Sequence, residues 1–208
     1  MVLIFDITYI LYSTIHSGAK ISNLGQPFYF RRMKTLVIVI HPDIESSAIN
    51  KRWIEELQKF PDKYAVHQLY KAYPDERINV QAEQKLVEQY SKIVFQFPFY
   101  WFSSPPLLKK WFDEVLAYGW AYGSKSSYRV SGKKIALAVS AGVDEQEYSQ
   151  GERYKYTLAE LTRPFELTFE YVKADYKPLF AYYGIELNSS DEWIEKSVPL
   201  YMEFLASL

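Results

Sequence analysis

The chain has 208 residues, with 24 lysines and arginines against 25 aspartates and glutamates, and it contains no cysteine. This length suits one domain of about 100–200 residues, or one domain with an appendage. The lack of cysteine excludes disulfides, thiolate metal sites and a catalytic thiol, and a net charge of −1 gives no indication of nucleic-acid binding.

Residues 1–32 differ in pattern from the rest of the chain. They begin with an apolar run that contains Asp6 but has no basic start and no clear small-residue cleavage site, so no signal peptide is predicted. Because no stretch reaches the ~20 apolar residues of a membrane span, we expect a cytoplasmic protein without direct membrane insertion. A strong strand pattern follows Met33 at once. We therefore interpret residues 1–32 as an N-terminal extension from a mis-assigned start, or alternatively as a genuine extra strand or arm.

From Lys34 onward, strand patterns alternate with helix patterns. Short apolar runs predict strands of a parallel sheet that is covered on both faces. Pro178 limits the last strand and suits an edge position, because proline cannot donate a ladder hydrogen bond. The predicted strands span residues 36–40, 64–70, 92–97, 134–139 and 179–183.

Between the strands, apolar residues recur at the spacing of amphipathic helices. The first three helices are predicted over residues 47–60, 80–90 and 105–116. The capping signals are Asn79 before the second helix and the capping-box pairs Thr157–Glu160 and Ser189–Glu192. Pro164 predicts a break or kink soon after Thr157, and Pro199 predicts a bend in the final helix.

This alternation predicts one α/β domain over residues 33–208, with a doubly wound five-stranded parallel sheet and helices on both faces. The flavodoxin-like strand order 2-1-3-4-5 suits five strands of this length. In that order ligands bind beyond the carboxyl ends of strands one and three, where the order reverses. The loops to inspect are therefore residues 41–50, 98–104 and 140–148.

Two of these loops have ligand-like composition. The first carries Ser46, Ser47 and Asn50 at a helix start, where hydroxyls and free N–H groups suit a phosphate. Ordinary helix capping by Ser46 or Ser47 is the alternative. The second, FPFYWFSSPP, gathers aromatic side chains at a strand end and suits a planar ring system.

Other chemistries lack their motifs. The sequence contains no GxGxxG, no GxxxxGK[ST] and no GxSxG, which argues against a Rossmann dinucleotide site, a nucleotide triphosphatase and a serine hydrolase. The three histidines show no metal-ligand spacing.

Several motifs in a fixed order resemble the flavin-dependent NAD(P)H:quinone oxidoreductases of flavodoxin-like fold. The small bacterial members are the most similar: general-stress quinone reductases and ancillary subunits of glutathione-gated potassium efflux systems. The shared features are HP followed by SxxN, YPD at 73–75, FPFYWFSSPPLLKKWFD at 97–113, GWAYG at 119–123 and RPF at 163–165. The resemblance covers the chain from about Lys34 to its C-terminus.

The resemblance implies a flavin site whose residues follow by position. Phosphate and ribityl contacts fall on His41, Ser47, Ala48, Ile49 and Asn50, ring contacts on Pro98, Phe99, Tyr100, Trp101 and Phe102, and the rest of the cradle on Ser140, Ala141, Gly142 and Val143. Relatives usually carry Thr-Thr-Gly-Gly in this last loop, so Val143 places a Cβ where a close backbone approach is expected. Tyr148 matches a catalytic tyrosine of some relatives. Arg153 is the nearest match to that tyrosine's companion histidine, with a solvated surface arginine as the alternative.

The implied reaction is two-electron reduction of a quinone or similar flat acceptor. NAD(P)H as co-substrate reduces bound FMN, rather than FAD, and the acceptor then reoxidises it in a ping-pong exchange. The resemblance also implies a homodimer with active sites near the subunit interface, which suits the aromatic residues around 111–122. Helix packing within one subunit would explain some of them equally well.

Two other functions stay open. One is a regulatory flavoprotein subunit of a potassium efflux antiporter. The other is a flavodoxin-type electron carrier. Carriers tend to be strongly acidic for docking, and the net charge of −1 argues against that function.

Overall fold

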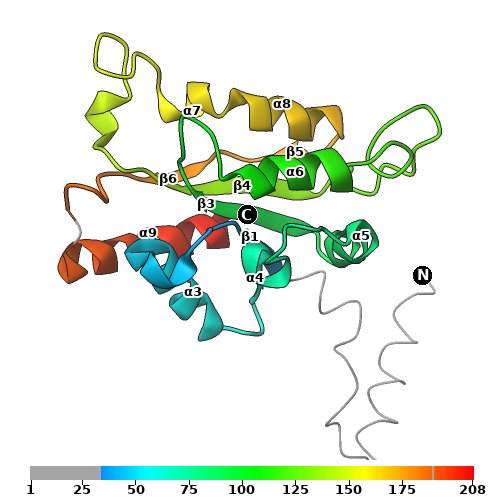
Figure 1. Cartoon of the computed structure of the whole chain (residues 1–208), viewed down its shortest axis with the longest axis horizontal. Helices are drawn as coiled ribbons and strands as arrows, with labels where there is room; N and C mark the ends of the chain where they lie inside the picture. Colours follow the sequence, from blue (N-terminus) through cyan, green and yellow to red (C-terminus); the bar gives the residue numbers. More distant parts are fainter. Residues whose placement is uncertain (1–33, 189) are drawn as a thin grey trace, which may run out of the picture.

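The structure is a computed structural model that describes residues 34–188 and 190–208 (Figure 1). The interpretation of residues 1–32 and the predicted cap at Ser189 lie outside the described residues. Within the described part of the chain, no helix combines the length and apolar composition needed to cross a bilayer.

The sheet has the predicted flavodoxin-like order, β2-β1-β3-β4-β5, and its strands are parallel. Its strands are β1 Thr35–Val39, β2 Tyr64–Gln68, β3 Lys92–Pro98, β4 Lys134–Ser140 and β5 Asp175–Tyr176. The order reverses between β1 and β3, so the predicted switch point for ligand binding is confirmed as a feature of the fold.

The fifth strand differs from the prediction. It forms as two pieces, β5 and β6 Phe180–Tyr182, which pair with opposite ends of β4. Pro178 lies between them and cannot donate a ladder hydrogen bond, so the strand is interrupted rather than limited to 179–183. The second strand ends at Gln68 because the chain turns there into α4 Leu69–Ala72.

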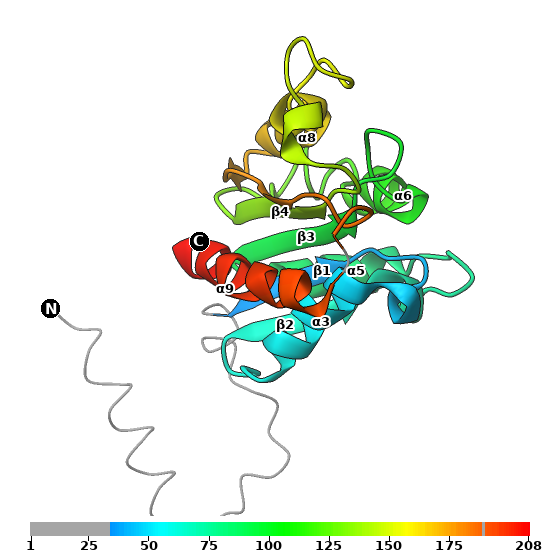
Figure 2. The same cartoon turned by 90° about the vertical axis from the view of Figure 1, so that its left-hand side faces the viewer.

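Helices cover both faces of the sheet (Figure 2). One face carries α3 Ala48–Gln58 and α9 Asp191–Ser207, and the other carries α5 Val80–Glu88, α6 Pro106–Val115 and α8 Arg163–Tyr171. The shorter pieces are η1 Ile44–Ser46, η2 Glu145–Glu147 and α7 Leu158–Leu161.

Each face has its own aromatic core, because side chains alternate between the two faces along a strand. On the α3/α9 face the rings of Trp53 and Tyr201 stack with centroids 4.6 Å apart. On the other face Phe95 packs against Trp111 at 5.3 Å and against Phe169 at 5.4 Å. Many of the chain's aromatic residues thus pack in the two cores.

The first two predicted helix caps are present. Asn79 accepts a hydrogen bond from the N–H of Ala82 at 3.1 Å, and Thr157 forms the capping box with Glu160. The break predicted near Pro164 falls at Thr162, between α7 and α8.

The last helix begins one residue later than the capping-box spacing predicts. Ser190 is its N-cap and accepts a hydrogen bond from the N–H of Trp193 at 3.3 Å. The helix continues through Pro199 to Ser207.

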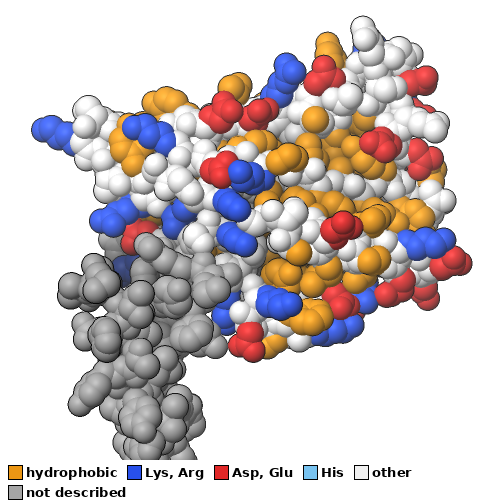
Figure 3. Space-filling model, turned by 180° about the vertical axis from the view of Figure 1, so that it is seen from behind, with side chains coloured by type: hydrophobic (Ala, Val, Ile, Leu, Met, Phe, Trp, Pro, Cys, Tyr) orange, Lys and Arg blue, Asp and Glu red, His pale blue; other side chains and the backbone are white. Residues whose placement is uncertain are grey.

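The surface combines charges of both signs with apolar area. On the face shown in Figure 3, basic and acidic side chains are interspersed around a broad hydrophobic area. This distribution is expected for a chain whose basic and acidic residues nearly cancel.

Candidate functional site

The first loop leads into the N-terminus of α3. Ser47 is the N-cap, and its Oγ accepts a hydrogen bond from the N–H of Asn50 at 3.2 Å. Ser46 instead donates its hydroxyl to the carbonyl of Asp43 at 3.0 Å. The first N–H groups of α3, at Ala48 and Ile49, have no partner inside the helix by its geometry. The capping role of Ser47 therefore leaves a helix N-terminus that suits an anion.

Two of the predicted phosphate residues turn their side chains inward. Ile49 is buried in the core between α3 and the sheet. Asn50 is 1% exposed, and its Nδ2 donates to Oγ of Ser47 at 3.3 Å and to Oγ of Ser140 at 2.9 Å. The Asn50 amide thus bridges the start of α3 to the end of β4. Both hydrogens of its NH₂ group are bonded within the protein, so neither is available to a phosphate.

His41 lies at the end of β1 in a half-buried position. Its Nδ1 accepts a hydrogen bond from the N–H of Asp43 at 3.2 Å, so its proton belongs on Nε2. Burial lowers the pKa of His41, although the charge and backbone N–H of Asp43 act in the opposite direction. The imidazole is therefore a neutral donor at physiological pH. It lines a cavity of about 330 Å³ together with Gln68, Tyr70 and Lys71.

The aromatic loop after β3 contains a strained two-residue turn. Tyr100 and Ser103 exchange backbone hydrogen bonds of 3.2 and 2.9 Å. Between them, Trp101 and Phe102 have φ values of 48° and 60°, a region that aromatic residues rarely adopt. Strain of this kind costs about 1–3 kcal/mol per residue and concentrates at functional sites.

This turn presents backbone donors rather than a buried ring. The Trp101 side chain is 94% exposed, so stacking area is available there only to a molecule that binds from outside. Within the described residues, the N–H groups of Trp101 and Phe102 donate no hydrogen bond. The turn therefore offers two N–H donors beside an exposed indole.

The loops after β3 and β4 are held together. Phe99 donates its N–H to the carbonyl of Ser140 at 2.8 Å. Its ring meets that of Tyr148 edge to face at 6.0 Å and that of Phe102 at 6.5 Å. Of the predicted ring-binding residues, Phe99 and Phe102 thus belong to one cluster with the predicted catalytic tyrosine.

Tyr148 is almost fully buried in that cluster. Its ring packs against Tyr154 at 4.9 Å and Tyr183 at 5.8 Å. Burial, followed by the charges of Tyr154 and Glu186, raises the pKa of Tyr148 to about 12. The phenol is therefore a neutral hydrogen-bond donor at physiological pH. Arg153 lies over the ring of Tyr154 at 5.2 Å, an arrangement that suits a surface cation–π contact.

The cradle loop after β4 is tied to the loop after β6. The carbonyls of Ala141, Gly142 and Val143 accept hydrogen bonds from the N–H groups of residues 185, 186 and 184. Ala141 also donates its N–H to the carbonyl of Tyr182 at 2.9 Å. Among the described residues, Gly142 and Val143 therefore keep their N–H groups for a ligand, whereas Ala141 does not. The φ of Val143 lies outside the left-handed region, so its Cβ is tolerated.

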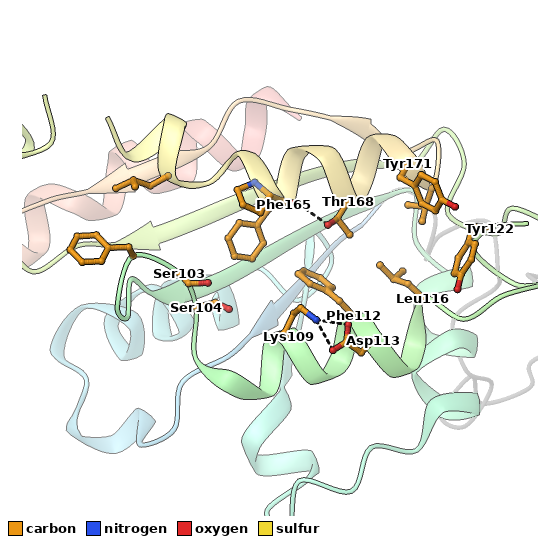
Figure 4. Close-up of a pocket in the computed structure, with 14 residues that line it drawn as sticks. Ser103, Ser104, Lys109, Phe112, Asp113, Leu116, Tyr122, Phe165, Thr168 and Tyr171 are labelled. Atoms are coloured by element: carbon orange, nitrogen blue, oxygen red, sulfur yellow. Dashed lines mark hydrogen bonds and ion pairs between the residues drawn. The ribbon is translucent and has the colours of Figure 1, made fainter. Parts of the chain in front are cut away.

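A groove between α6 and α8 was missing from the sequence-based site. It has a volume of about 560 Å³, and its lining includes Phe102 of the strained turn. Ser103, which follows that turn, lies toward one end of the groove (Figure 4). Phe112 and Phe165 form part of its lining, and Tyr122 lies at its far end. The aromatic GWAYG motif that contains Tyr122 was the available signal for this surface.

A buried carboxylate was also missed, although it lies away from the strand ends. Glu83 on α5 accepts hydrogen bonds from His67 at 2.9 Å, Tyr73 at 2.7 Å and Trp111 at 2.8 Å. It lies three residues before Leu86 on the predicted apolar stripe, so an acidic residue on that stripe was the signal. Among the described residues, no group of acidic residues and histidines has the arrangement of a metal site.

The comparisons with known proteins agree with this fold. Residues 33–203 match the protein family described as having the flavodoxin-like fold, and the chain belongs to that family. General stress protein 14 of Bacillus subtilis is 48% identical over 173 residues, which cover 83% of this chain and 97% of that protein. The uncharacterized NAD(P)H oxidoreductase YrkL of the same organism is 45% identical, covering 83% and 98% of the two chains.

Solved structures extend the likeness. The general stress protein 14 of Treponema denticola, in complex with FMN, is 45% identical with a TM-score of 0.79, covering 84% of this chain and 98% of that one. An NADPH-quinone reductase from P. pentosaceus is 30% identical with a TM-score of 0.74, covering 83% of this chain and 98% of that one.

A further sequence relative is the potassium-efflux ancillary protein KefG of Pectobacterium carotovorum. It is 33% identical, covering 84% of this chain and 93% of that protein.

Proposed function

We propose that this protein is a flavin-dependent NAD(P)H:quinone oxidoreductase that binds FMN at the carboxyl ends of β1, β3 and β4. The observation that carries the proposal is the convergence of the three predicted loops. Asn50 bridges the start of α3 to Ser140, and Phe99 bonds the β3 loop to the same residue. The FMN complex of the 45% identical Treponema protein supports this choice of cofactor.

The residues present fit an FMN molecule. The start of α3 offers the N–H groups of Ala48 and Ile49 and the hydroxyl of Ser47 to a phosphate. The strained turn offers the N–H groups of Trp101 and Phe102, which suit the acceptor atoms along one edge of the ring system. These donors are fixed in advance by hydrogen bonds within the protein, so little ordering remains to be done on binding.

When bound, FMN supplies the two-electron chemistry that the amino acids themselves lack. The chain's own groups orient and stabilise charge. The N–H groups of Gly142 and Val143, which have no acceptor among the described residues, would stabilise negative charge on the ring in the manner of an oxyanion hole. The neutral phenol of Tyr148 can hold a proton beside the ring or donate it to an acceptor's oxygen. This division of roles requires no protein nucleophile, in agreement with a chain that has no cysteine.

The acceptor would be a quinone or a similar flat molecule. It would bind at the flavin site after NAD(P)H has left that site. The names of two relatives, an NAD(P)H oxidoreductase and an NADPH-quinone reductase, support this substrate pair. The aromatic edges of Phe99 and Tyr148 suit a planar ring better than an aliphatic one.

A homodimer would complete the pocket. The groove between α6 and α8 begins at the strained turn, and Tyr122 and Tyr171 stand at its other end (Figure 4). Tyr171 is 68% exposed in one subunit. Large exposed aromatic residues along an apolar groove are typical of the centre of a protein interface, so we assign this face to the second subunit.

A second candidate function is that of a regulatory flavoprotein subunit. The 33% identical KefG protein is named as an ancillary protein of a glutathione-regulated potassium-efflux system. A regulatory subunit would bind FMN through the same loops and would bind an antiporter from its surface. Both functions therefore share the cofactor site, and turnover distinguishes them.

The test is spectroscopic and begins with the purified protein loaded with FMN. Addition of NADH or NADPH without oxygen should bleach the visible flavin bands rapidly, and a quinone should restore them. Bands that do not bleach would refute the reductase function and favour the regulatory subunit or an electron carrier. Failure to bind FMN at all would refute both flavin functions.

A further inference from the structure

A chain of buried hydrogen bonds connects the C-terminal helix to the candidate flavin site. Tyr201 on α9 donates its phenol hydrogen to Oε1 of Gln96 at 2.7 Å. Nε2 of Gln96 donates to the backbone and side-chain oxygens of Asn50, each at 3.2 Å. Nδ2 of Asn50 donates in turn to Oγ of Ser140 at 2.9 Å. We call Tyr201, Gln96 and Asn50 the buried relay.

The relay lies in a layer that is otherwise apolar. Gln96 and Tyr201 are 0% exposed and lie between the sheet and α9, in the region of Val94 and Ala138. A buried amide destabilises a fold unless both its donor and its acceptor are satisfied. Both are satisfied here, by Asn50 on one side and Tyr201 on the other. An apolar residue would serve core packing alone, whereas the Gln96 amide ties β3 both to Asn50 and to Tyr201.

All the hydrogen bonds of the relay point the same way. In each one the donor lies on the side of α9, and the last acceptors lie at the start of α3 and the end of β4. Oγ of Ser140 accepts the last bond, and Oγ of Ser47 accepts from the backbone N–H and from Nδ2 of Asn50. Both hydroxyls therefore act as acceptors toward the protein and keep a proton to donate. Within the described residues, neither proton has an acceptor.

We propose that Tyr201 and Gln96 are positioning residues of the flavin site, which hold Asn50 so that Ser47 and Ser140 present hydroxyl donors at a fixed separation. This inference rests on the proposed function. Ser47 would serve the phosphate end of the cofactor and Ser140 its ring end. Tyr201 and Gln96 act only through Asn50, since both are buried within the core.

The phenol of Tyr201 completes the set of bonds around Gln96. The backbone carbonyl of Asn50 can only accept a hydrogen bond, so it keeps Nε2 of Gln96 directed toward Asn50 and leaves the Gln96 oxygen for the phenol. Without the Tyr201 hydroxyl that buried oxygen loses its donor. The Gln96 side chain would then turn away from Asn50, and Asn50 would no longer hold Ser47 and Ser140 at one separation.

The experiment compares two ligands on the apoprotein of Tyr201→Phe. Flavin fluorescence gives the Kd of FMN, which uses both hydroxyls, and that of riboflavin, which lacks the phosphate. We expect FMN binding to weaken about tenfold, the effect of one lost buried hydrogen bond, and riboflavin binding to weaken by less than about threefold. Gln96→Met, which removes the amide but keeps the volume, should reproduce the change in the ratio of the two constants.

Ser197→Ala is the matched control. Ser197 on α9 is 0% exposed and accepts a hydrogen bond from Trp53 on α3 at 2.8 Å, so it joins the same two helices without touching Asn50. Ser197→Ala should lower Tm about as much as Tyr201→Phe does and should leave the dissociation constants of FMN and riboflavin unchanged. An unaltered FMN-to-riboflavin ratio in Tyr201→Phe, or an equal change in Ser197→Ala, would overturn the positioning role.

Hydrogen exchange on the apoprotein separates this inference from the proposed function. If the relay holds the two segments together, Tyr201→Phe should speed exchange at residues 48–50 and 141–143, whereas Ser197→Ala should not. Equal exchange in the wild type and Tyr201→Phe refutes the relay. A wild-type protein that binds no FMN refutes the proposed function and the cofactor role, while faster exchange would still support the structural link.

Discussion

The indole N–H of Trp111 donates to the carboxylate of Glu83 at 2.8 Å, which joins α6 to α5. The other oxygen of Glu83 accepts hydrogen bonds from His67 on β2 and from Tyr73. Burial alone would raise the pKa of Glu83, but the hydrogen bond and charge of His67, with the donors Trp111 and Tyr73, outweigh it and lower the pKa. A buried ionised carboxylate thus fixes the helix that follows the aromatic turn.

Glu83→Gln should destabilise the fold by about 1–3 kcal/mol at neutral pH, because the new NH₂ group faces donors where an acceptor is required. Since the folded pKa lies below the ordinary value, the carboxylate stabilises the fold above that ordinary value. This contribution is lost as the pH falls through the folded pKa. The difference between wild type and variant should therefore shrink on acidification, as measured by urea unfolding at a series of pH values.

Glu88→Gln provides the control on the same helix. Glu88 also accepts a hydrogen bond from an indole, that of Trp120 at 2.8 Å, but its side chain is 37% exposed. We expect a loss of at most about 1 kcal/mol, because water can satisfy its groups. If both variants lose the same stability, burial is not what makes Glu83 important.

Trp101→Ala should leave the stability of the protein nearly unchanged and should weaken FMN retention. The side chain is 94% exposed, so it contributes little to the core, whereas under the proposed function the indole would cover the bound ring. Loss of one aromatic contact weakens binding by about 0.5–1.5 kcal/mol. The measurements are Tm of the apoprotein and the flavin content after gel filtration.

Trp101→Phe tests the reason for that effect. It keeps an aromatic ring at the same strained φ of 48°, so it should retain most of the flavin that Trp101→Ala loses. Full flavin content and normal turnover in Trp101→Ala would show that the ring binds elsewhere.

Tyr148→Phe should lower turnover by at least about tenfold while leaving the FMN content intact, because it removes only the proton-donating hydroxyl. With a pKa raised to about 12 by burial, the phenol stays protonated through the neutral range. The ratio of wild-type to variant turnover should thus be constant from mildly acidic to mildly alkaline pH. Tyr154→Phe is the control, since its ring packs on Tyr148 at 4.9 Å and has no assigned role. Equal turnover in wild type and Tyr148→Phe would remove this residue from the mechanism.

The strand order and the main helices were predictable because each depends on local patterns. Continuous apolar runs marked the buried strands, and the cap at Asn79 marked the start of α5. The split of the last strand was not predicted, although Pro178 was recognised. A single proline can either limit a strand or interrupt it. Here β4 pairs with the residues before Pro178 and with those after it, so the strand is interrupted.

The candidate site was predictable as three loops but not in its internal bonding. Asn50 was expected to contact phosphate, and the sequence could not show that its amide is used by Ser140, ninety positions away. The positive φ values at Trp101 and Phe102 were equally hidden, because no glycine marks that turn. Long-range hydrogen bonds and strain arise from tertiary contacts, whereas the motif fixes only where the loop lies.

Val143→Gly restores the glycine that relatives usually carry in the cradle loop, and we expect it to give no gain in FMN affinity. The φ of Val143 lies outside the left-handed region, and its side chain packs against the core, so the valine is not strained. The substitution should cost about 1 kcal/mol of stability through the greater freedom of glycine in the unfolded chain. Titration of both apoproteins with FMN, together with their Tm values, is the measurement. A glycine variant that binds FMN about tenfold more tightly would mean that the Cβ of Val143 obstructs the approach of the cofactor to this loop.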